Sequence, residues 1–313
     1  YDPDYISAAN NININKNFYK KLSINNNNII YSAKNESNNK INSKLAVLIP
    51  TSGSTGSPKF VKLSYDNLKT NTKSIISYLK LNSKDKTILS LPSSYSYGLS
   101  IINTHIEVKA TIILTKYSSI QKEFWDLFKK NKNITNLSNV PIFFQFIKKL
   151  KINIFEYSKI RFLCVAGGHL DYDTSRYIYE NSKRHKIKFF IMYGQTEASP
   201  RMSYLEWKKF YLKLGSIGKP LDGCKFQIFR EDRKIIKKSY VKGEIVFFGK
   251  NVSLGYSKNY KDLYKGDINK GILYTGDIGY KDNENYYFLS ARKNRISKIF
   301  GLRINLDDIE NFL

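Results

Sequence analysis

The chain has 313 residues, of which 42% are hydrophobic, which is enough for a sizeable core in one large or two unequal domains. No apolar run approaches the roughly 20 residues that a membrane helix needs. The first residues, YDPDYISAANN, carry acidic side chains and no apolar segment, so they do not form a signal peptide. The net charge is +26 at pH 7, which raises the question of nucleic-acid binding.

The basic charge is weak evidence for a nucleic-acid partner. Only nine of the 52 basic residues are arginine, whereas bidentate recognition of bases and phosphates favours arginine. The lysines are scattered, and the chain is also rich in Asn, Ile, Tyr and Phe, residues that share AT-rich codons with lysine. Base composition therefore explains the charge better than a partner does. The two cysteines, Cys164 and Cys224, lack metal-ligand spacing and favour a reducing compartment such as the cytoplasm.

From Leu45 onward, short apolar runs alternate with longer amphipathic stretches. The runs predict strands at 45–49, 87–91, 110–114, 160–166 and 188–193. The stretches predict helices at 66–80, 98–107, 119–130, 141–151 and 172–184, with Asp66 and Asp173 as N-caps of the first and last. The strands are continuous apolar runs, which is typical of a parallel sheet covered on both faces. The predicted fold class is α/β: a layered α/β subdomain with a largely parallel sheet, plus a smaller β-rich subdomain.

Composition separates three segments before the end of the chain. Residues 1–44 are Asn-rich and low in complexity, with one strand-like run, NIIYSA. Residues 45–205 form the α/β subdomain, and 206–292, rich in glycine and β-type runs, form the β-rich subdomain. The chain lacks an initiator Met and ends at DDIENFL, within a helix-like segment, so we expect it to be part of a longer polypeptide.

The stretch PTSGSTGSPKF, which begins at Pro50, joins a strand to a helix-like segment and is rich in hydroxyls and glycines. Backbone N–H groups, hydroxyls and a lysine in such a loop can hold phosphates. The spacing does not fit the common G-x-x-x-x-G-K-[ST] loop, because Ser57, Pro58 and Lys59 follow Gly56. Taken alone, the loop is equally compatible with a surface turn.

Three further motifs follow in order: MYGQTEAS (192–199), YTGDIGY (274–280) and ARKNRISKIFGLRINLDDIE (291–310). Together with the loop, they resemble the signature set of the adenylate-forming superfamily, which includes acyl-CoA synthetases, aryl-acid ligases and peptide-synthetase adenylation domains. The resemblance begins near residue 45 and also covers VPIFFQF, CVAGGHL, GSIGKPLDG and GEIVFFGKNVSLGY. Departures from the family pattern include Phe60, Tyr65 and Ala291.

The resemblance implies a large N-terminal domain that uses ATP and Mg²⁺ to convert a carboxylic acid to an acyl-adenylate and then transfers the acyl group to CoA or to a carrier-protein pantetheine. It implies catalytic roles for Thr196, Glu197 and Lys59, and metal ligation by Thr55 and Glu197. The nucleotide-binding residues that it implies are Thr51, Ser52, Gly53, Ser54, Thr55, Gly56, Lys59, Gly167, Gly168, Tyr193, Gly194, Thr196, Asp277 and Arg292. Tyr193 would stack on adenine, and Asp277 and Arg292 would contact the ribose.

The acid pocket implied by the resemblance contains Tyr95, Ser96, Tyr97, Gly98, Ala166 and His169. No acidic residue occurs in LPSSYSYGLS (91–100), so the expected substrate lacks a charged amine. The resemblance implies that residues 1–44 are a remnant of a longer N-terminal segment and that 293–313 are a hinge and the start of a further domain. Asn294 falls at the family's hinge, and the resemblance puts the adenylating lysine beyond Leu313. Two alternatives stay open: a degenerate nucleotide-binding module without catalysis, and a basic nucleic-acid-binding protein.

Overall fold

The computed structural model describes residues 41–51, 59–157 and 159–293, together with the backbone of five further strands. These strands are β1 (Tyr5–Ala9), β2 (Tyr19–Asn25), β3 (Asn28–Ala33), β19 (Ile296–Ile299) and β20 (Leu302–Asn305). The first three pair as an antiparallel sheet in the order β1-β3-β2, and β19 pairs with β20. The strand predicted from NIIYSA coincides with β3.

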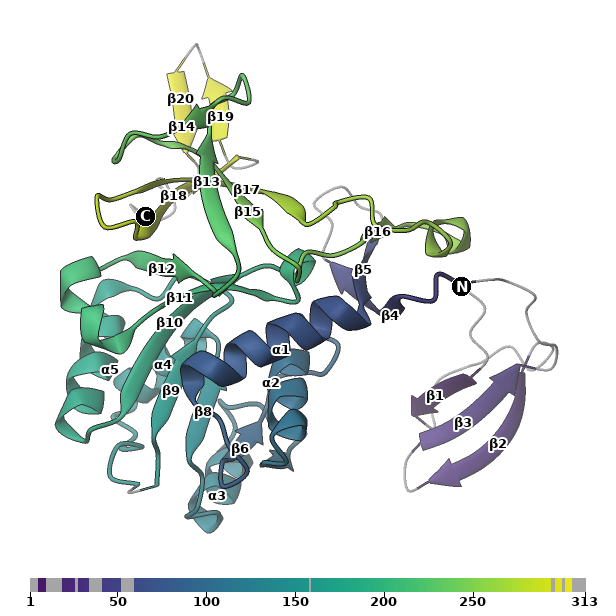
Figure 1. Cartoon of the computed structure of the whole chain (residues 1–313). Helices are drawn as coiled ribbons and strands as arrows, with labels where there is room; N and C mark the ends of the chain where they lie inside the picture. Colours follow the sequence, from purple (N-terminus) through teal and green to yellow (C-terminus); the bar gives the residue numbers. More distant parts are fainter. Residues whose placement is uncertain are drawn as a thin grey trace.

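The predicted parallel sheet is confirmed. Its strands run in the order β10-β9-β8-β6-β7, and every neighbouring pair is parallel (Figure 1). Their bounds are β6 (Lys86–Leu89), β7 (Thr111–Leu114), β8 (Asn136–Asn139), β9 (Phe162–Val165) and β10 (Lys188–Gly194). Strand β8 was not predicted, because its sequence NLSN has no apolar run despite its burial at the centre of the sheet.

Helices cover both faces of this parallel sheet, as the sequence predicted. They are α1 (Tyr65–Leu79), α2 (Ser96–Glu107), α3 (Lys122–Lys130), α4 (Pro141–Lys149) and α5 (Tyr172–Arg184). The side chains of β9 show the two layers: Phe162 and Cys164 pack with α1 and α2, whereas Leu163 and Val165 pack with α3, α4 and α5. Burial on both faces explains why β9 is apolar at every position.

Antiparallel strands extend the same sheet beyond β10, which gives a mixed twelve-stranded sheet in the described part of the chain. The added strands are β11 (Arg201–Leu205), β12 (Ser216–Pro220), β13 (Lys225–Phe229), β14 (Ile235–Ile236), β15 (Gly243–Phe248), β17 (Ile272–Lys281) and β18 (Tyr287–Arg292). Short 3-10 turns lie at η1 (Thr196–Ala198), η2 (Trp207–Lys209), η3 (Tyr211–Lys213) and η4 (Tyr260–Leu263). The β-rich region therefore continues the parallel sheet through β11 and β12.

The prediction that the phosphate loop joins a strand directly to a helix was wrong. Its flanking strands, β4 (Leu45–Thr51) and β5 (Lys59–Ser64), pair antiparallel, and β16 (Gly255–Ser257) adds to β5. Strand β5, KFVKLS, carries two lysines and was not predicted. Yet Lys62 is fully buried, because its ammonium donates to the carbonyl oxygens of Asp262 and Lys265, each at 2.8 Å.

Both predicted N-caps lie two residues too late. Helix α1 is capped by Ser64, whose hydroxyl accepts from the Asn67 amide while the Asn67 side chain accepts from the Ser64 amide. This reciprocal pair satisfies two otherwise unpaired donors. Helix α5 is capped by Asp171, which accepts from the Thr174 amide. In both helices the predicted cap is instead an acid of the first turn.

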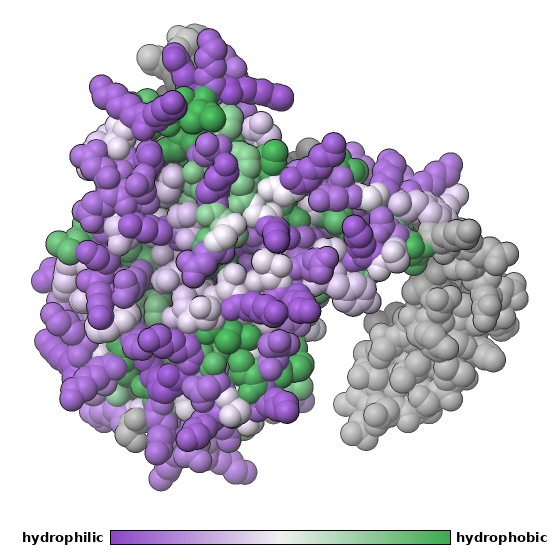
Figure 2. Space-filling view, viewed as in Figure 1, coloured by the Kyte–Doolittle hydropathy of each residue, from purple (hydrophilic) through white to green (hydrophobic). Residues whose placement is uncertain are grey.

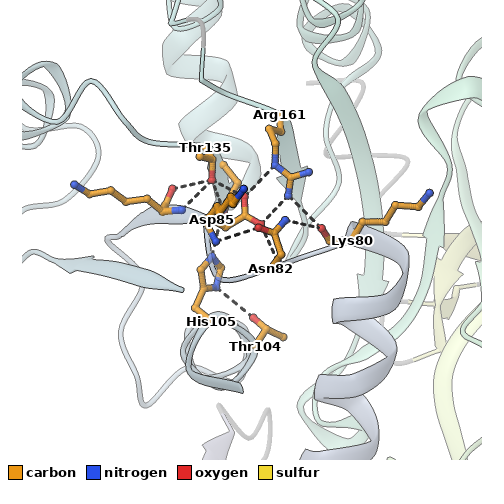
Figure 3. A network of polar contacts seen from close by, with 10 residues as sticks. Lys80, Asn82, Asp85, Thr104, His105, Thr135 and Arg161 are labelled. Atoms are coloured by element: carbon orange, nitrogen blue, oxygen red, sulfur yellow. Dashed lines mark hydrogen bonds and ion pairs between the residues drawn. The ribbon is translucent and has the colours of Figure 1, made fainter. Parts of the chain in front are cut away.

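A polar network joins three parallel strands at their amino ends, away from the carboxyl ends where β10 reaches Gly194 (Figure 3). Asp85 accepts from the Thr135 hydroxyl at 2.7 Å and from Arg161 through Nε at 3.0 Å and Nη2 at 2.7 Å. Asn136 links this group to the buried ring of His105 at 3.3 Å. Burial would raise the pKa of Asp85, but these hydrogen bonds hold it below its usual value.

The visible surface is mostly hydrophilic, and hydrophobic side chains form small separate patches on it (Figure 2). Of the helices in the part of the chain described here, none has the length and apolar character needed to cross a membrane.

Candidate functional site

The central residues of the phosphate loop, Ser52, Gly53, Ser54, Thr55 and Gly56, lie outside the described residues. The hinge candidate Asn294 does so as well. The two ends of the loop are described. Thr51 and Lys59 are paired residues of β4 and β5, and the Thr51 hydroxyl donates to the Lys59 carbonyl oxygen at 3.3 Å. The base of the loop is thus a closed hairpin.

Lys59 and Glu197 both contact Tyr256, one at the ring and the other at the hydroxyl. The Lys59 ammonium lies 4.0 Å from the centre of the Tyr256 ring, a cation–π contact. The Tyr256 hydroxyl donates to Oε1 of Glu197 at 2.6 Å. Burial and the adjacent Glu197 raise the pKa of Tyr256, so the phenol stays protonated and remains a donor at neutral pH. The structure therefore brings the loop lysine close to the proposed metal carboxylate.

Tyr193 and Asp277, 84 residues apart, are joined by a hydrogen bond of 2.5 Å from the phenol to Oδ2. Gln195 Nε2 donates to the same oxygen at 2.9 Å, and Arg292 Nε donates to Oδ1 at 3.0 Å. Burial and the negative charge of Asp277 raise the pKa of Tyr193 well above its usual value. This cluster fixes a buried carboxylate beside the end of β10, where Thr275 also accepts from Gln195 through its carbonyl oxygen.

Thr196 connects the nucleotide motif to the predicted acid pocket. Its hydroxyl lies 3.0 Å from that of Ser96, the first residue of α2. Ser96 is buried, and Thr196 begins the 3-10 turn that also carries Glu197. The two predicted sites are therefore neighbours, as a reaction between a nucleotide and an acid requires.

The predicted acid pocket contains residues with different roles. Tyr97 is buried and donates to the Cys164 carbonyl oxygen at 3.3 Å, with Tyr95 edge-on at a ring-centroid distance of 6.3 Å. Gly98 serves packing, because a Cβ there would lie 2.2 Å from the Pro92 carbonyl oxygen. His169 is exposed.

Gly167 and Gly168 form the turn after β9 and its neighbour Ala166. Gly167 has φ +88°, and a Cβ would lie 2.4 Å from the hydroxyl of Tyr95. At Gly168 a Cβ would come within 3.3 Å of Pro141. The turn therefore needs glycine both for its backbone angle and for the close approach of Tyr95.

Three residues of the site were not predicted: Gln195, Arg201 and Tyr256. Gln195 stands inside the motif MYGQTEAS and Tyr256 ends the quoted GEIVFFGKNVSLGY, so the motifs contained the signal. Gly194 pairs with Arg201 across β10 and β11, and a Cβ at Gly194 would lie 2.0 Å from the Pro200 carbonyl oxygen. Arg201 carried no sequence signal, because a lone arginine usually belongs to the surface.

The charged side chains of the site suit a nucleotide whose Mg²⁺ ion has few protein ligands. Lys59 supplies positive charge, while Asp277 offers a buried carboxylate for hydroxyl donors. Within residues 41–51, 59–157 and 159–293, no group of three His, Cys, Asp or Glu side chains could form a protein-built metal site. Mg²⁺ needs no such group, because it is commonly held by one or two carboxylates plus substrate phosphates. Glu197 fits that requirement.

A protein-family comparison matches residues 6–257 to the model described as "AMP-binding enzyme". The chain belongs to this family. Among its curated relatives are 2-succinylbenzoate–CoA ligases of Bacillus cereus (29% identical over 268 residues) and Bacillus cytotoxicus (30% over 267 residues). In each case the match covers 85% of this chain and 53% of the relative, so the chain spans about half the length of these enzymes.

Solved structures of o-succinylbenzoate CoA synthetase from Bacillus subtilis share the fold. The complex with the acyl-adenylate intermediate OSB-AMP has a TM-score of 0.75 and 26% identity, and the match covers 87% of this chain and 54% of that one. The complex with AMP has a TM-score of 0.73 and 26% identity, and the match covers 87% of this chain and 55% of that one. Membership of the family and the α/β fold expected from the motifs are thus confirmed.

Proposed function

We propose that the protein activates a carboxylic acid with ATP and transfers the acyl group to a thiol, with CoA as the favoured acceptor and a carrier-protein pantetheine as the second. The observation that carries the proposal is the 3.0 Å contact between Ser96 and Thr196, which joins the acid pocket to the nucleotide motif. The relatives are named as CoA ligases, and a structural neighbour contains an acyl-adenylate. The reducing compartment suggested by the free thiols of Cys164 and Cys224 supports a cytoplasmic location.

In the first half-reaction, a carboxylate oxygen forms a bond to the α-phosphorus of ATP, and the bond to the bridging oxygen of pyrophosphate breaks. Asp277 would accept from the ribose hydroxyls, held in place by Gln195 and Arg292. The Thr196 hydroxyl would donate to the α-phosphate, and Lys59 would neutralise the outer phosphates. Mg²⁺, held by Glu197, would supply further neutralisation when bound.

The hydrogen bond from Tyr193 to Asp277 adds a constraint to the adenine-stacking role expected of this tyrosine. Its hydroxyl is committed to Asp277, so the ring has a fixed orientation. A fixed aromatic ring loses little entropy when a purine stacks on it. We therefore keep the proposal that Tyr193 supports adenine, with Gly167 and Gly168 allowing close approach of the backbone on another side.

Acid-dependent exchange of pyrophosphate into ATP by the full-length protein tests the function. The panel includes 2-succinylbenzoate, because the relatives carry that name, together with simple aliphatic and aromatic acids. Exchange with any acid supports the proposal. Nucleotide binding without exchange for the whole panel would favour the non-catalytic module, and salt-sensitive RNA binding without ATP affinity would favour the nucleic-acid hypothesis.

The subdomain boundaries at 205 and 292 remain predictions.

A further inference from the structure

The five parallel strands of the sheet begin side by side, at the end of the molecule opposite the candidate site. Their first residues are in register: Lys86 pairs with Thr111, Asn136 pairs with Phe162, and Phe162 pairs with Lys188. Each strand is preceded by the end of a helix and a short turn. These helix ends and turns form one surface, which we call the amino-end face and which consists of residues 80–86, 107–111, 129–136, 148–157, 159–161 and 183–188.

Positive charge is concentrated on the amino-end face. Its 39 residues include 14 lysines, two arginines and three acidic residues, so it carries +13 of the net charge of +26. The other 274 residues also carry +13, so the face has about seven times their net charge per residue. A codon bias toward lysine would raise the charge along the whole chain and does not explain this concentration. The lysines are scattered in the sequence but gather in space, because the chain returns to this face once in each strand–helix unit.

Helix dipoles account for only part of this charge. A cation in the last turn of a helix is favourable, and α3, α4 and α5 each carry two cations there. The face has further exposed lysines beyond the helix ends, among them Lys132, Lys151 and Lys186. Of the ion pairs between described residues, only that of Arg161 with Asp85 lies on this face. Most of its positive charge is therefore available to an anionic partner.

The composition of the face favours a lipid surface over a protein or a nucleic acid. Stable protein interfaces are poor in lysine, and recognition of bases and phosphates in nucleic acids favours arginine. Binding of single-stranded nucleic acid also uses exposed aromatic rings, whereas the rings of Phe155 and Tyr157 on this face pack against the core. Anionic lipid headgroups attract lysines by charge alone and need no defined geometry.

Two apolar side chains at the face also suit a lipid surface. Leu150, between Lys149 and Lys151 at the end of α4, is 55% exposed, and Ile106 near the end of α2 is 64% exposed. Figure 2 shows this face at the lower end of the molecule, where the visible side chains are mainly hydrophilic. An apolar side chain among lysines can enter the boundary between headgroups and acyl chains while the ammonium groups stay at the phosphates.

We infer that the amino-end face binds the surface of a membrane that contains anionic phospholipid. The contact is peripheral: the lysines lie near the lipid phosphates, and Leu150 reaches below the headgroups. The candidate site lies at the carboxyl ends of the same strands, so it faces away from the lipid and stays open to solvent. The inference does not depend on the proposed function.

Flotation of the full-length protein with lipid vesicles tests the inference. One set of vesicles is pure phosphatidylcholine, and the other contains about 30% phosphatidylserine, both at about 0.15 M salt, where the attraction between exposed charges is already largely screened beyond about 8 Å. We expect the partition coefficient to be at least tenfold higher for the anionic vesicles. A difference below twofold would overturn the inference.

A triple variant assigns the binding to the face. It combines Lys148→Gln, Lys149→Gln and Lys151→Gln, and we expect it to lower the partition coefficient on anionic vesicles at least tenfold, because each lysine near such a surface contributes about fivefold. Leu150→Ser should lower it about threefold, and an unchanged value would overturn the part assigned to Leu150. If the triple variant does not fold, a second one on α5 decides, which combines Lys183→Gln, Arg184→Gln and Lys186→Gln.

A matched control separates the face from the total charge. It combines Lys237→Gln, Lys238→Gln and Lys242→Gln, which are exposed positions in the β-rich region, and it lowers the net charge by three as the face variant does. We expect the control to keep the wild-type partition coefficient within about twofold. Equal losses in the two variants would show that the total charge alone attracts the vesicles, and the inference would be wrong.

RNA is the competing partner, and it is titrated under the same conditions as a single strand and as a duplex of about 20 base pairs. Weaker binding to both RNAs than to anionic vesicles, compared per accessible phosphate, supports the lipid assignment. Tighter binding to either RNA, lost in the face variant and kept in the control, would assign the face to nucleic acid and overturn the inference.

Discussion

The hydroxyl of Tyr256 donates to a carboxylate oxygen of Glu197 at 2.6 Å, while the Lys59 ammonium lies over the ring of the same tyrosine. One phenol thus fixes the proposed metal carboxylate and the loop lysine at once. It comes from β16, and the lysine comes from β5, its neighbour in the small sheet. The small sheet therefore has a positioning role in addition to carrying the phosphate loop.

Tyr256→Phe removes the hydrogen bond to Glu197 and keeps the ring under Lys59. We expect the Mg²⁺ concentration for half-maximal ATP binding to rise about three- to tenfold. This effect is small for a hydrogen bond to a charged group, because both side chains reach solvent. Calorimetric ATP titrations over a series of Mg²⁺ concentrations measure this. Tyr260→Phe, at an exposed position nearby, is the control. An unchanged Mg²⁺ dependence would remove Tyr256 from the site.

Gly167→Ala introduces both backbone strain and a clash with the Tyr95 hydroxyl. Strain at a positive φ costs about 1–3 kcal/mol, and Gly223→Ala isolates it, since Gly223 has φ +74° and an added Cβ would meet no atom within 4 Å. We expect Gly167→Ala to lower the free energy of unfolding more than Gly223→Ala does. In a Tyr95→Phe background the two losses should become similar. Urea unfolding of the set checks this, and equal losses in the original background would show that Tyr95 yields freely.

Much of the fold follows from the sequence because local physics determines it. The strands β6, β9 and β10 are apolar runs buried on both faces, β7 is an apolar run at the edge of the sheet, and α5 has a clear amphipathic pattern. All five elements were predicted within a few residues. Strand β8 is polar yet central. Its position depends on its neighbours in the sheet, and no local pattern expresses that.

The candidate site was predictable as a set of motifs but not as a geometry. The contact between Tyr193 and Asp277 spans 84 residues, and only the resemblance brought the two motifs together. Lys62 and Arg201 are residues whose burial no motif or local pattern predicted. Each is a charged side chain that the sequence assigns to the surface, and each is buried because partners far along the chain surround it.

Asp85→Asn tests the polar network at the amino ends of the strands (Figure 3). The folded-state pKa of Asp85 is lowered, so its stabilisation is present above the unfolded pKa of about 3.9 and is lost as the pH falls through the folded value. We expect a loss of about 2–3 kcal/mol at pH 7 that shrinks below about pH 4. Denaturant unfolding at several pH values measures it, with exposed Asp126→Asn as control. A pH-independent loss would mean that the charge of Asp85 contributes nothing.

Asp277→Asn tests the proposed ribose contact while preserving the size of the side chain. Wild-type Asp277 presents a buried carboxylate held by Tyr193, Gln195 and Arg292. An acceptor left without its donor costs about 1–3 kcal/mol, so we expect the wild type to bind ATP about tenfold tighter than 2′-deoxy-ATP. In Asp277→Asn this ratio should fall to about two. The ratio compares two nucleotides on one protein, so a general loss of folded molecules cancels, and exposed Asp232→Asn should keep the wild-type ratio. Equal binding of both nucleotides by the wild type would show that Asp277 does not read the 2′-hydroxyl, and a ratio preserved in Asp277→Asn would assign that reading to another residue.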